Sequence, residues 1–200
     1  MEFRALFLRK LREELANFER LCIRTGRVPA VRLNVSTDIP WERVAPGLFA
    51  EFRRIRFYDY SAYSADNRAV LPANYQLCHS WKETTAFAYV ESTIRAGRNI
   101  VVPFDSAYAP ARGLFGALPA EVVFVCRETG RSIRVRVRNG DKHDFRFRET
   151  DGAGVCIGLH GKSGRSKVTA AVESGFMRHH AEGAKLRRVT IHVGTVTVEC

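Results

Sequence analysis

The sequence predicts an α/β fold, a partial or distorted barrel of mostly parallel strands with an antiparallel C-terminal third. The first half twice repeats the order strand, polar loop, helix, strand, which is typical of βα units on a parallel sheet. After residue 105 the helical periodicity fades and short strands follow one another. Residues 132–137 then alternate between aliphatic side chains and arginine, which predicts a strand with one buried face.

The first predicted element is an amphipathic helix over residues 3–24. Its apolar residues recur at spacings of three and four, and Thr25-Gly26 ends it. A strand is expected over residues 29–35. Pro40 favours the start of a helix that continues to about Arg54, and a short strand follows over residues 55–60.

The second repeat begins with a predicted strand over residues 74–80. A helix over residues 83–96 ends at Gly97, and an apolar strand follows over residues 99–104. Later elements are a loop at 106–119, strands at 122–126, 132–137, 145–147 and 155–159, and a strand or hairpin at 186–198. We therefore expect a single α/β domain over residues 1–178 and a C-terminal extension over residues 179–200.

The chain is strongly basic and its charge is rich in arginine. Lys and Arg number 32 against 21 Asp and Glu, a formal net charge of +11, and only six of the basic residues are lysine. The excess is spread evenly over both halves of the chain. Arginine suits phosphate and carboxylate better than lysine does, so the composition favours an anionic partner. The alternative is a GC-rich coding sequence that writes arginine wherever a positive charge is tolerated.

The cysteines and the hydropathy pattern restrict the cellular location and the cofactors that the sequence predicts. Five cysteines are widely spaced and form no CxxC pair, which predicts reduced, mostly buried thiols in a cytoplasmic protein and makes an iron–sulfur cluster unexpected. No run of 18 apolar residues occurs, so no membrane association is expected.

Polar and aromatic residues gather where the predicted parallel strands end. Ligands of open α/β sheets and barrels bind beyond the carboxyl ends of the strands. The sequence therefore predicts a pocket at this rim. The alternative is that some of these side chains only cap helices. The candidate pocket residues are Asn34, Ser36, Trp41, Tyr58, Tyr60, His79 and Ser80, with Asp38 and Asp59 as candidate acids.

A dense group of titratable residues follows the alternating strand, at residues 139–144. Asp141 and Asp144 would orient His143 as a general base, or the three would bind a divalent cation together with Asp38 or Asp59. The alternative is that the two carboxylates neutralise the arginines around them. These arginines, with the basic Gly-rich loop at 161–167, are the candidate phosphate contacts: Arg134, Arg136, Arg138, Arg146, Lys162, Arg165 and Lys167.

Three stretches carry a resemblance to a known family. They are VRLNVSTDIPWE at 31–42; FYDY at 57–60 with PANYQL at 72–77; and NGDKHDFRF at 139–147 with residues 155–162 and 174–176. In this order they resemble an uncharacterised family encoded by phages and plasmids, over residues 3–177. Longer members of that family look like trimmed relatives of radical-SAM-type α/β barrels with an N-terminal cysteine cluster, which this sequence lacks.

Two main hypotheses of function follow. The first is a mobile-element accessory protein that binds nucleic acid or a host nucleoprotein through its arginine-rich surface, and the resemblance implies antagonism of host defence. Exposed aromatic residues such as Trp41 would then stack on bases. The alternative is an enzyme acting on a nucleotide or phosphorylated substrate in the rim pocket. A regulatory module without chemistry is a third interpretation. The sequence predicts neither a metal identity nor an oligomeric state.

Overall fold

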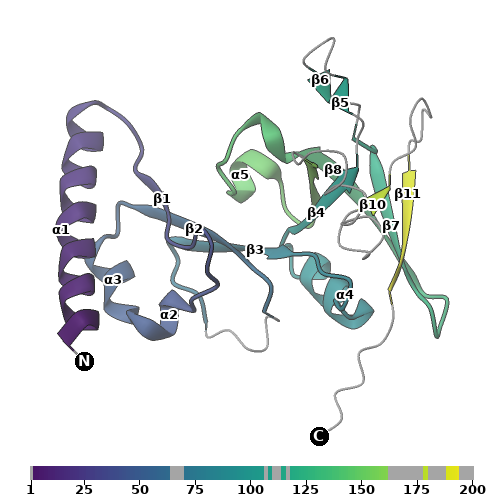
Figure 1. Cartoon of the computed structure of the whole chain (residues 1–200), viewed down its shortest axis with the longest axis horizontal. Coiled ribbons are helices and arrows are strands. Elements are labelled where there is room, and N and C mark those ends of the chain that lie inside the picture. Colours follow the sequence, from purple (N-terminus) through teal and green to yellow (C-terminus); the bar gives the residue numbers. More distant parts are fainter. Residues whose placement is uncertain are drawn as a thin grey trace, which may run out of the picture. The chain divides into compact units, whose positions relative to one another are not determined.

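A computed structural model describes residues 2–63, 70–105, 108–109, 114–115, 118–161, 178–179 and 188–193. The chain divides into two compact units. Unit 1 comprises Met1–Tyr60 and Asp66–Leu77, and unit 2 comprises Ser61–Ala65 and Cys78–Cys200. Figure 1 labels most of the helices and strands of both. Strand β3 (Tyr75–Ser80) begins in unit 1 and ends in unit 2.

Unit 1 begins with the long helix that the periodicity predicts. Its elements are α1 (Glu2–Arg24), β1 (Ala30–Arg32), α2 (Trp41–Val44), α3 (Pro46–Glu51) and β2 (Arg56–Ser61), which leads to β3. Strands β1 and β2 are parallel and the two short helices connect them. The single helix expected after Pro40 is broken at Ala45. Pro46 has no N–H and disfavours a helical conformation in the residue before it, so a new helix begins there.

The core of unit 1 lies between its helices and strands. Leu48, Ile55 and Phe57 are completely buried. Leu15 of α1 packs into the same cluster, which explains why the apolar stripe of this helix docks on one side only. Phe49 stacks on Tyr75 with ring centroids 4.7 Å apart.

A single amide side chain organises the loop between β1 and α2. The Oδ1 atom of the buried Asn34 accepts hydrogen bonds from the Thr37 hydroxyl (2.9 Å), the Ile39 N–H (3.1 Å) and the Trp41 indole (3.1 Å). Its Nδ2 donates to the Ile39 carbonyl at 3.1 Å. The loop therefore depends on Asn34, and neither Thr37 nor Asp38 makes a side-chain cap on α2.

Unit 2 contains most of the strands. After the end of β3 come α4 (Phe87–Arg95), β4 (Ile100–Asp105), β7 (Glu121–Cys126), β8 (Ser132–Asn139), η3 (Gly140–Lys142), α5 (Arg148–Asp151) and β9 (Cys156–His160). Two later strands are β10 (Arg178–His179) and β11 (Arg188–Val193). Strands β5 (Tyr108–Ala109) and β6 (Leu114–Phe115) form a separate antiparallel pair.

The strand pairing confirms the predicted fold class. Unit 1 has the order β1-β2-β3, and unit 2 the order β3-β4-β9-β8-β7-β11, with β10 beside β4. In the main sheet of unit 2, β7–β8 is an antiparallel hairpin and the other described pairs are parallel. The described strand order has two ends rather than closing on itself, as a partial barrel does.

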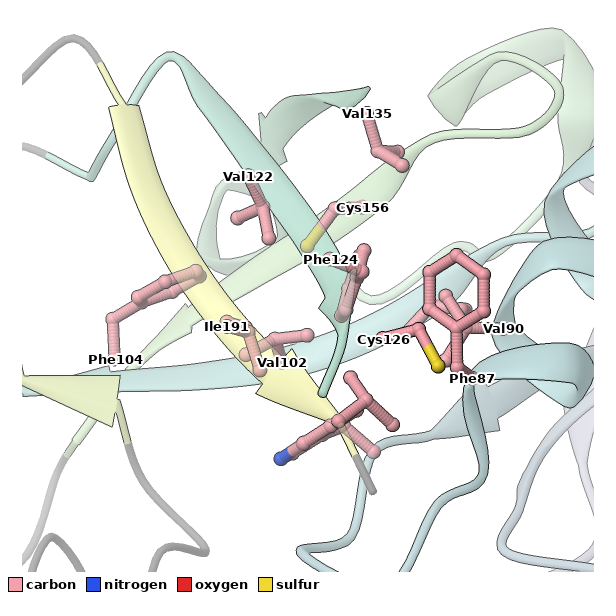
Figure 2. Packing of buried hydrophobic residues seen from close by; sticks show 13 residues of the cluster. Phe87, Val90, Val102, Phe104, Val122, Phe124, Cys126, Val135, Cys156 and Ile191 are labelled. Atoms are coloured by element: carbon pink, nitrogen blue, oxygen red, sulfur yellow. The ribbon is translucent and has the colours of Figure 1, made fainter. Parts of the chain in front are cut away.

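The core of unit 2 lies between one face of this sheet and α4. Val102 and Phe104 of β4, Val122 and Phe124 of β7, and Ile191 of β11 contribute fully or almost fully buried side chains. They form one cluster with Phe87 and Val90 of α4, and Figure 2 shows these two beside Cys126 and Phe124. The alternation predicted for residues 132–137 is present, because Val135 is buried in this core while its arginine neighbours are exposed.

One predicted strand is absent. Residues 145–147 are extended but pair with no strand in the described part of the chain, and they lead directly into α5. The segment from Gly140 to Asp151 instead follows the outer face of β9. None of the helices in the described ranges is long and apolar enough to cross a membrane.

Replacing Asn34 tests whether the loop between β1 and α2 depends on the hydrogen bonds of this side chain. Asn34→Ala leaves the buried Trp41 indole N–H and the Ile39 N–H without their acceptor, so we expect the free energy of unfolding to fall by about 2–4 kcal/mol in urea titrations. Asn34→Asp keeps one acceptor oxygen but places a second oxygen against the Ile39 carbonyl in a buried site, so it should also destabilise the loop. The exposed Thr84→Ala in unit 2 is the control, with a change within about 0.5 kcal/mol. Equal effects of Asn34→Ala and Thr84→Ala would contradict this role.

Candidate functional site

Asp59, a candidate acid, lies at the centre of unit 1. Its side chain is completely buried. Its Oδ1 accepts the backbone N–H of Asn34 at 2.7 Å, and its Oδ2 accepts the Tyr75 hydroxyl at 2.9 Å. These bonds connect β2 with the end of β1 and with β3. This internal position differs from the substrate-facing role that the sequence predicted.

The aromatic candidates of unit 1 are also internal. Trp41 is 4% exposed and Tyr58 is 6% exposed, so neither offers a ring face on which a base could stack. Tyr60 is half-buried, and the guanidinium of Arg32 lies 5.3 Å from its ring centroid. The rim of unit 1 is therefore packed with internal contacts at its aromatic positions.

Two polar candidates of unit 1 are closer to solvent. Ser36 is exposed in the loop that Asn34 organises. Asp38 in the same loop is half-buried and has an interaction partner of its own. Both residues therefore lie in the loop after β1, whereas Asp59 lies within β2.

In unit 2, His79 is buried at the end of β3. Its Nε2 lies 3.5 Å from the Thr85 hydroxyl, and its ring meets Tyr89 edge to face at 4.3 Å. Ser80 follows it and is half-buried. In register, His79 pairs with Ile100, which pairs in turn with Cys156 at the start of β9, whereas His160 pairs with Phe104 near the far end of β4. The stagger of the strands therefore keeps His79 away from the end of β9.

The dense acidic group after β8 folds back onto the sheet. The Asn139 side chain accepts the Asp141 N–H at 2.9 Å and so caps the short helix η3. This turn carries Asp141 to the carboxyl end of β9. There its Oδ2 accepts both the backbone N–H of His160 (2.8 Å) and the ring Nδ1 (2.6 Å). Since a carboxylate only accepts, this short contact places a proton on His160 Nδ1.

Gly140 allows this close approach. A Cβ atom at this position would lie 2.5 Å from Ile157 Cγ2 and 2.7 Å from Leu159 Cδ2, distances that packed atoms do not tolerate. The backbone of η3 therefore lies directly against β9 only because residue 140 has no side chain. The sequence NG at 139–140 is needed here for packing rather than for a hairpin turn.

Arg146 is inside the protein, which corrects its place among the candidate phosphate contacts. It is 1% exposed. Its guanidinium donates to the carbonyls of Gly140 and Phe145, and its Nη1 lies 3.8 Å from Asp151 Oδ1. A buried guanidinium is tolerated only when its donors are satisfied in this way. Arg146 therefore joins the two ends of the folded-back segment.

Asp151 completes this buried group. Its Oδ1 lies near Arg146 and is 4.0 Å from His143 Nε2, while its buried Oδ2 meets no hydrogen-bond donor in the described part of the chain. Burial raises the pKa of Asp151, and the nearby charges of Arg146 and His143 partly oppose that shift. Burial and the charge of Asp151 also raise the pKa of Cys78 to about 12, so this thiol stays protonated.

His143 does not pair with the carboxylates that the sequence assigned to it. Its Nδ1 lies 3.1 Å from the Phe145 carbonyl, so Nδ1 carries a proton and Nε2 points toward Asp151. Asp144 is exposed. The sequence did not predict the two pairs that the structure shows, His160 with Asp141 and His143 with Asp151. His160 had a signal, because it ends an apolar strand, while Asp151 had none.

The arginines of β8 have a different environment from Arg146. Arg134, Arg136 and Arg138 are exposed on one face of the strand, and no ion pair joins them to another described residue. We name these three residues the arginine row. By contrast, the neighbouring Arg131 forms an ion pair with Glu91 at 2.7 Å. One interpretation of the sequence was that the acidic residues at 141–144 neutralise these arginines. In the described structure none of those acidic residues forms an ion pair with the arginine row.

The surroundings of the arginine row are mostly uncharged. Across the β7–β8 pair, Arg134 is opposite Val123 and Arg136 is opposite Glu121. On the next strand, His192 is exposed and pairs with Val125. Among the described strand partners of the row, Glu121 is therefore the one carboxylate.

The remaining candidates concern the basic loop and metals. Lys162, Arg165 and Lys167 lie outside the described residues. In the described ranges, no three side chains of His, Cys, Asp or Glu lie close enough together to hold a metal ion. The divalent cation suggested by the sequence therefore has no described ligand set.

The fold and this surface define an α/β protein with a mostly parallel sheet, an exposed arginine row and a half-buried pair of Asp141 and His160. Comparison with known proteins identifies its family. The family model described as "Gene product 88" matches residues 2–180, so the chain belongs to the Gene product 88 family, a phage-type family. No curated protein and no solved structure matches the chain significantly. The relation to radical-SAM-type barrels stays a prediction.

Changing Asp151 tests the electrostatics of the buried group. The raised pKa means that protonated Asp151 stabilises the fold at low pH, and that this contribution is lost as the pH rises through the raised value. We therefore expect the free energy of unfolding of the wild type, relative to Asp151→Asn, to decrease as the pH rises from acidic to neutral values. Urea titrations over this range measure the difference.

The exposed Asp144→Asn removes one carboxylate from the same segment and serves as the control for a general change of net charge. A wild-type protein that gains stability relative to Asp151→Asn as the pH rises would show that Arg146 outweighs burial at Asp151.

Proposed function

We propose that this protein binds nucleic acid through the arginine row of β8. The observation that carries the proposal is the exposure of Arg134, Arg136 and Arg138 on one face, without ion pairs to described residues. Alternate residues of a strand are about 6.6 Å apart, so the row is a regular line of guanidinium groups. Guanidinium binds phosphate oxygens in a bidentate manner.

The position of the aromatic residues indicates what kind of binding to expect. Trp41, Tyr58 and Trp81 are buried, so base stacking on these rings does not contribute. Affinity would come from phosphate contacts, which carry no sequence information and depend strongly on salt. The proposal is therefore a sequence-tolerant electrostatic surface rather than a base-reading site.

Membership in a phage-type family supports a role in the mobile element or its host. A host nucleoprotein would offer the same phosphate groups as free nucleic acid. Antagonism of host defence remains an extension of this proposal that depends on the family resemblance alone.

Removing the row tests the proposal. We expect Arg134→Ala/Arg136→Ala/Arg138→Ala to weaken a gel shift of double-stranded DNA or RNA at low salt. The slope of log affinity against log salt should become shallower by about 2 to 3, since about 0.9 counterion is released per phosphate contact. Fluorescence anisotropy between about 50 and 200 mM salt measures the slope.

A matched control removes the same charge elsewhere. Arg24, Arg27 and Arg54 are also exposed and have no ion pair with described residues, so Arg24→Ala/Arg27→Ala/Arg54→Ala changes the net charge equally. If both triple variants lose affinity to the same degree, net charge rather than the row is responsible. If the wild type gives no shift at low salt, the proposal is wrong.

An enzyme is the second candidate, and one observation favours it. The 2.6 Å contact of Asp141 with His160 Nδ1 is the geometry by which a carboxylate orients a histidine for general acid–base work. The pair lies at the carboxyl end of a parallel strand, where α/β proteins bind ligands. In this proposal His160, and not His143, acts on a nucleotide or phosphorylated substrate.

Turnover of a panel of nucleotides and phosphorylated compounds, followed by phosphate release and chromatography, tests this candidate. We expect His160→Gln to lower the rate by about 10²–10⁴-fold, because general acid–base catalysis contributes that much. Asp141→Asn should lower it as well, while His143→Gln should leave it unchanged. Wild-type protein that turns over nothing in the panel, or a fully active His160→Gln variant, would rule the candidate out.

A further inference from the structure

Helix α1 has exposed apolar side chains besides those that pack against the rest of unit 1. Leu8, Leu11 and Leu15 contact the core of unit 1. Yet Phe3 is 89% exposed and Leu21 46%, and Phe7 is 55% exposed although one side of its ring stacks on Trp41 with centroids 6.3 Å apart. A single exposed apolar residue is ordinary, but several on one side of a helix mark a contact surface.

These residues belong to a regular seam. Counting along α1, the exposed positions Phe3, Phe7, Lys10, Glu14, Asn17 and Leu21 are separated alternately by four and three residues. This 3.5-residue repeat is the one by which two helices keep the same side facing each other. All six side chains are exposed, and we name them the α1 seam.

The α1 seam is complementary to itself when a second copy runs in the opposite direction. A two-fold axis level with residue 12 places Phe3 opposite Leu21 of the other copy and Phe7 opposite Asn17. The same axis places Lys10 opposite Glu14, once on each side. We propose that two copies of this chain associate through an antiparallel pair of α1 helices.

Charge selects this orientation. A parallel pair would place Lys10 against Lys10 and Glu14 against Glu14, which repel. In the single chain, Lys10 bonds the exposed Glu13 at 2.7 Å, a solvent-exposed pair that contributes little. Glu14 has no ion pair with a described residue. Both charges are therefore available to a second copy.

The size of the seam sets the expected affinity. Helix α1 has 23 residues and is about 34 Å long, and its seam ends in apolar groups with polar ones between. A contact of one helix pair belongs to the small interfaces, which are weak and exchange readily. We expect a monomer–dimer equilibrium in the micromolar range of protein concentration.

Sedimentation of the full chain over a range of concentrations tests the dimer, and charge exchange tests its geometry. Lys10→Glu should abolish the dimer, since two carboxylates then face each other at each of two symmetric positions. Glu14→Lys should do the same through its ammonium groups. The double variant Lys10→Glu/Glu14→Lys restores opposite charges across the axis, so dimerisation should return to near the wild-type level.

Apolar substitutions provide the second arm. Phe3→Ser/Leu21→Ser should weaken association at least tenfold, while Ile23→Ser, an exposed apolar residue of α1 outside the seam, should not. Circular dichroism establishes that α1 stays folded in each variant. A chain that is monomeric at all concentrations, or a double charge exchange that fails to restore the dimer, would overturn the proposal. Neither result bears on the arginine row, which lies on β8.

Discussion

The close approach of Gly140 to β9 is the constraint on which unit 2 depends. Because residue 140 has no Cβ, η3 lies against Ile157 and Leu159, and the Gly140 carbonyl meets the guanidinium of Arg146. The following segment is thereby held on the outer face of β9. Both acid–histidine contacts, Asp141 with His160 and Asp151 with His143, depend on this close packing of Gly140 against β9.

The same packing divides the outer face of the sheet in unit 2 into two parts. Over β9 the face is covered, and Ile157 is completely buried there. Over β8 nothing in the described chain covers the arginines, although their alternate neighbour Val135 is buried on the inner side. A covering segment that ends at β9 therefore leaves the arginine row in solvent.

The sequence predicted features that depend on local periodicity and missed those that depend on long-range contact. The apolar repeats in α1 and β8 were sufficient to predict these two elements, because each repeat places apolar residues on one side. Residues 145–147 were expected to form a strand, but they pair with no described strand and lead into α5. The stagger that separates His79 from His160 is a property of pairing register, which no local pattern contains.

Net charge did not by itself distinguish the two kinds of arginine that this protein contains. Arg146 and Arg138 are eight positions apart and have the same side chain, yet one is buried and the other exposed. Arg146 can be internal because the Phe145 and Gly140 carbonyls and Asp151 replace its water. The described structure offers Arg138 no such acceptors, so its guanidinium stays hydrated. Of the basic residues behind the net charge of +11, those that can bind a partner are therefore the ones whose charged groups have no acceptor within the protein itself.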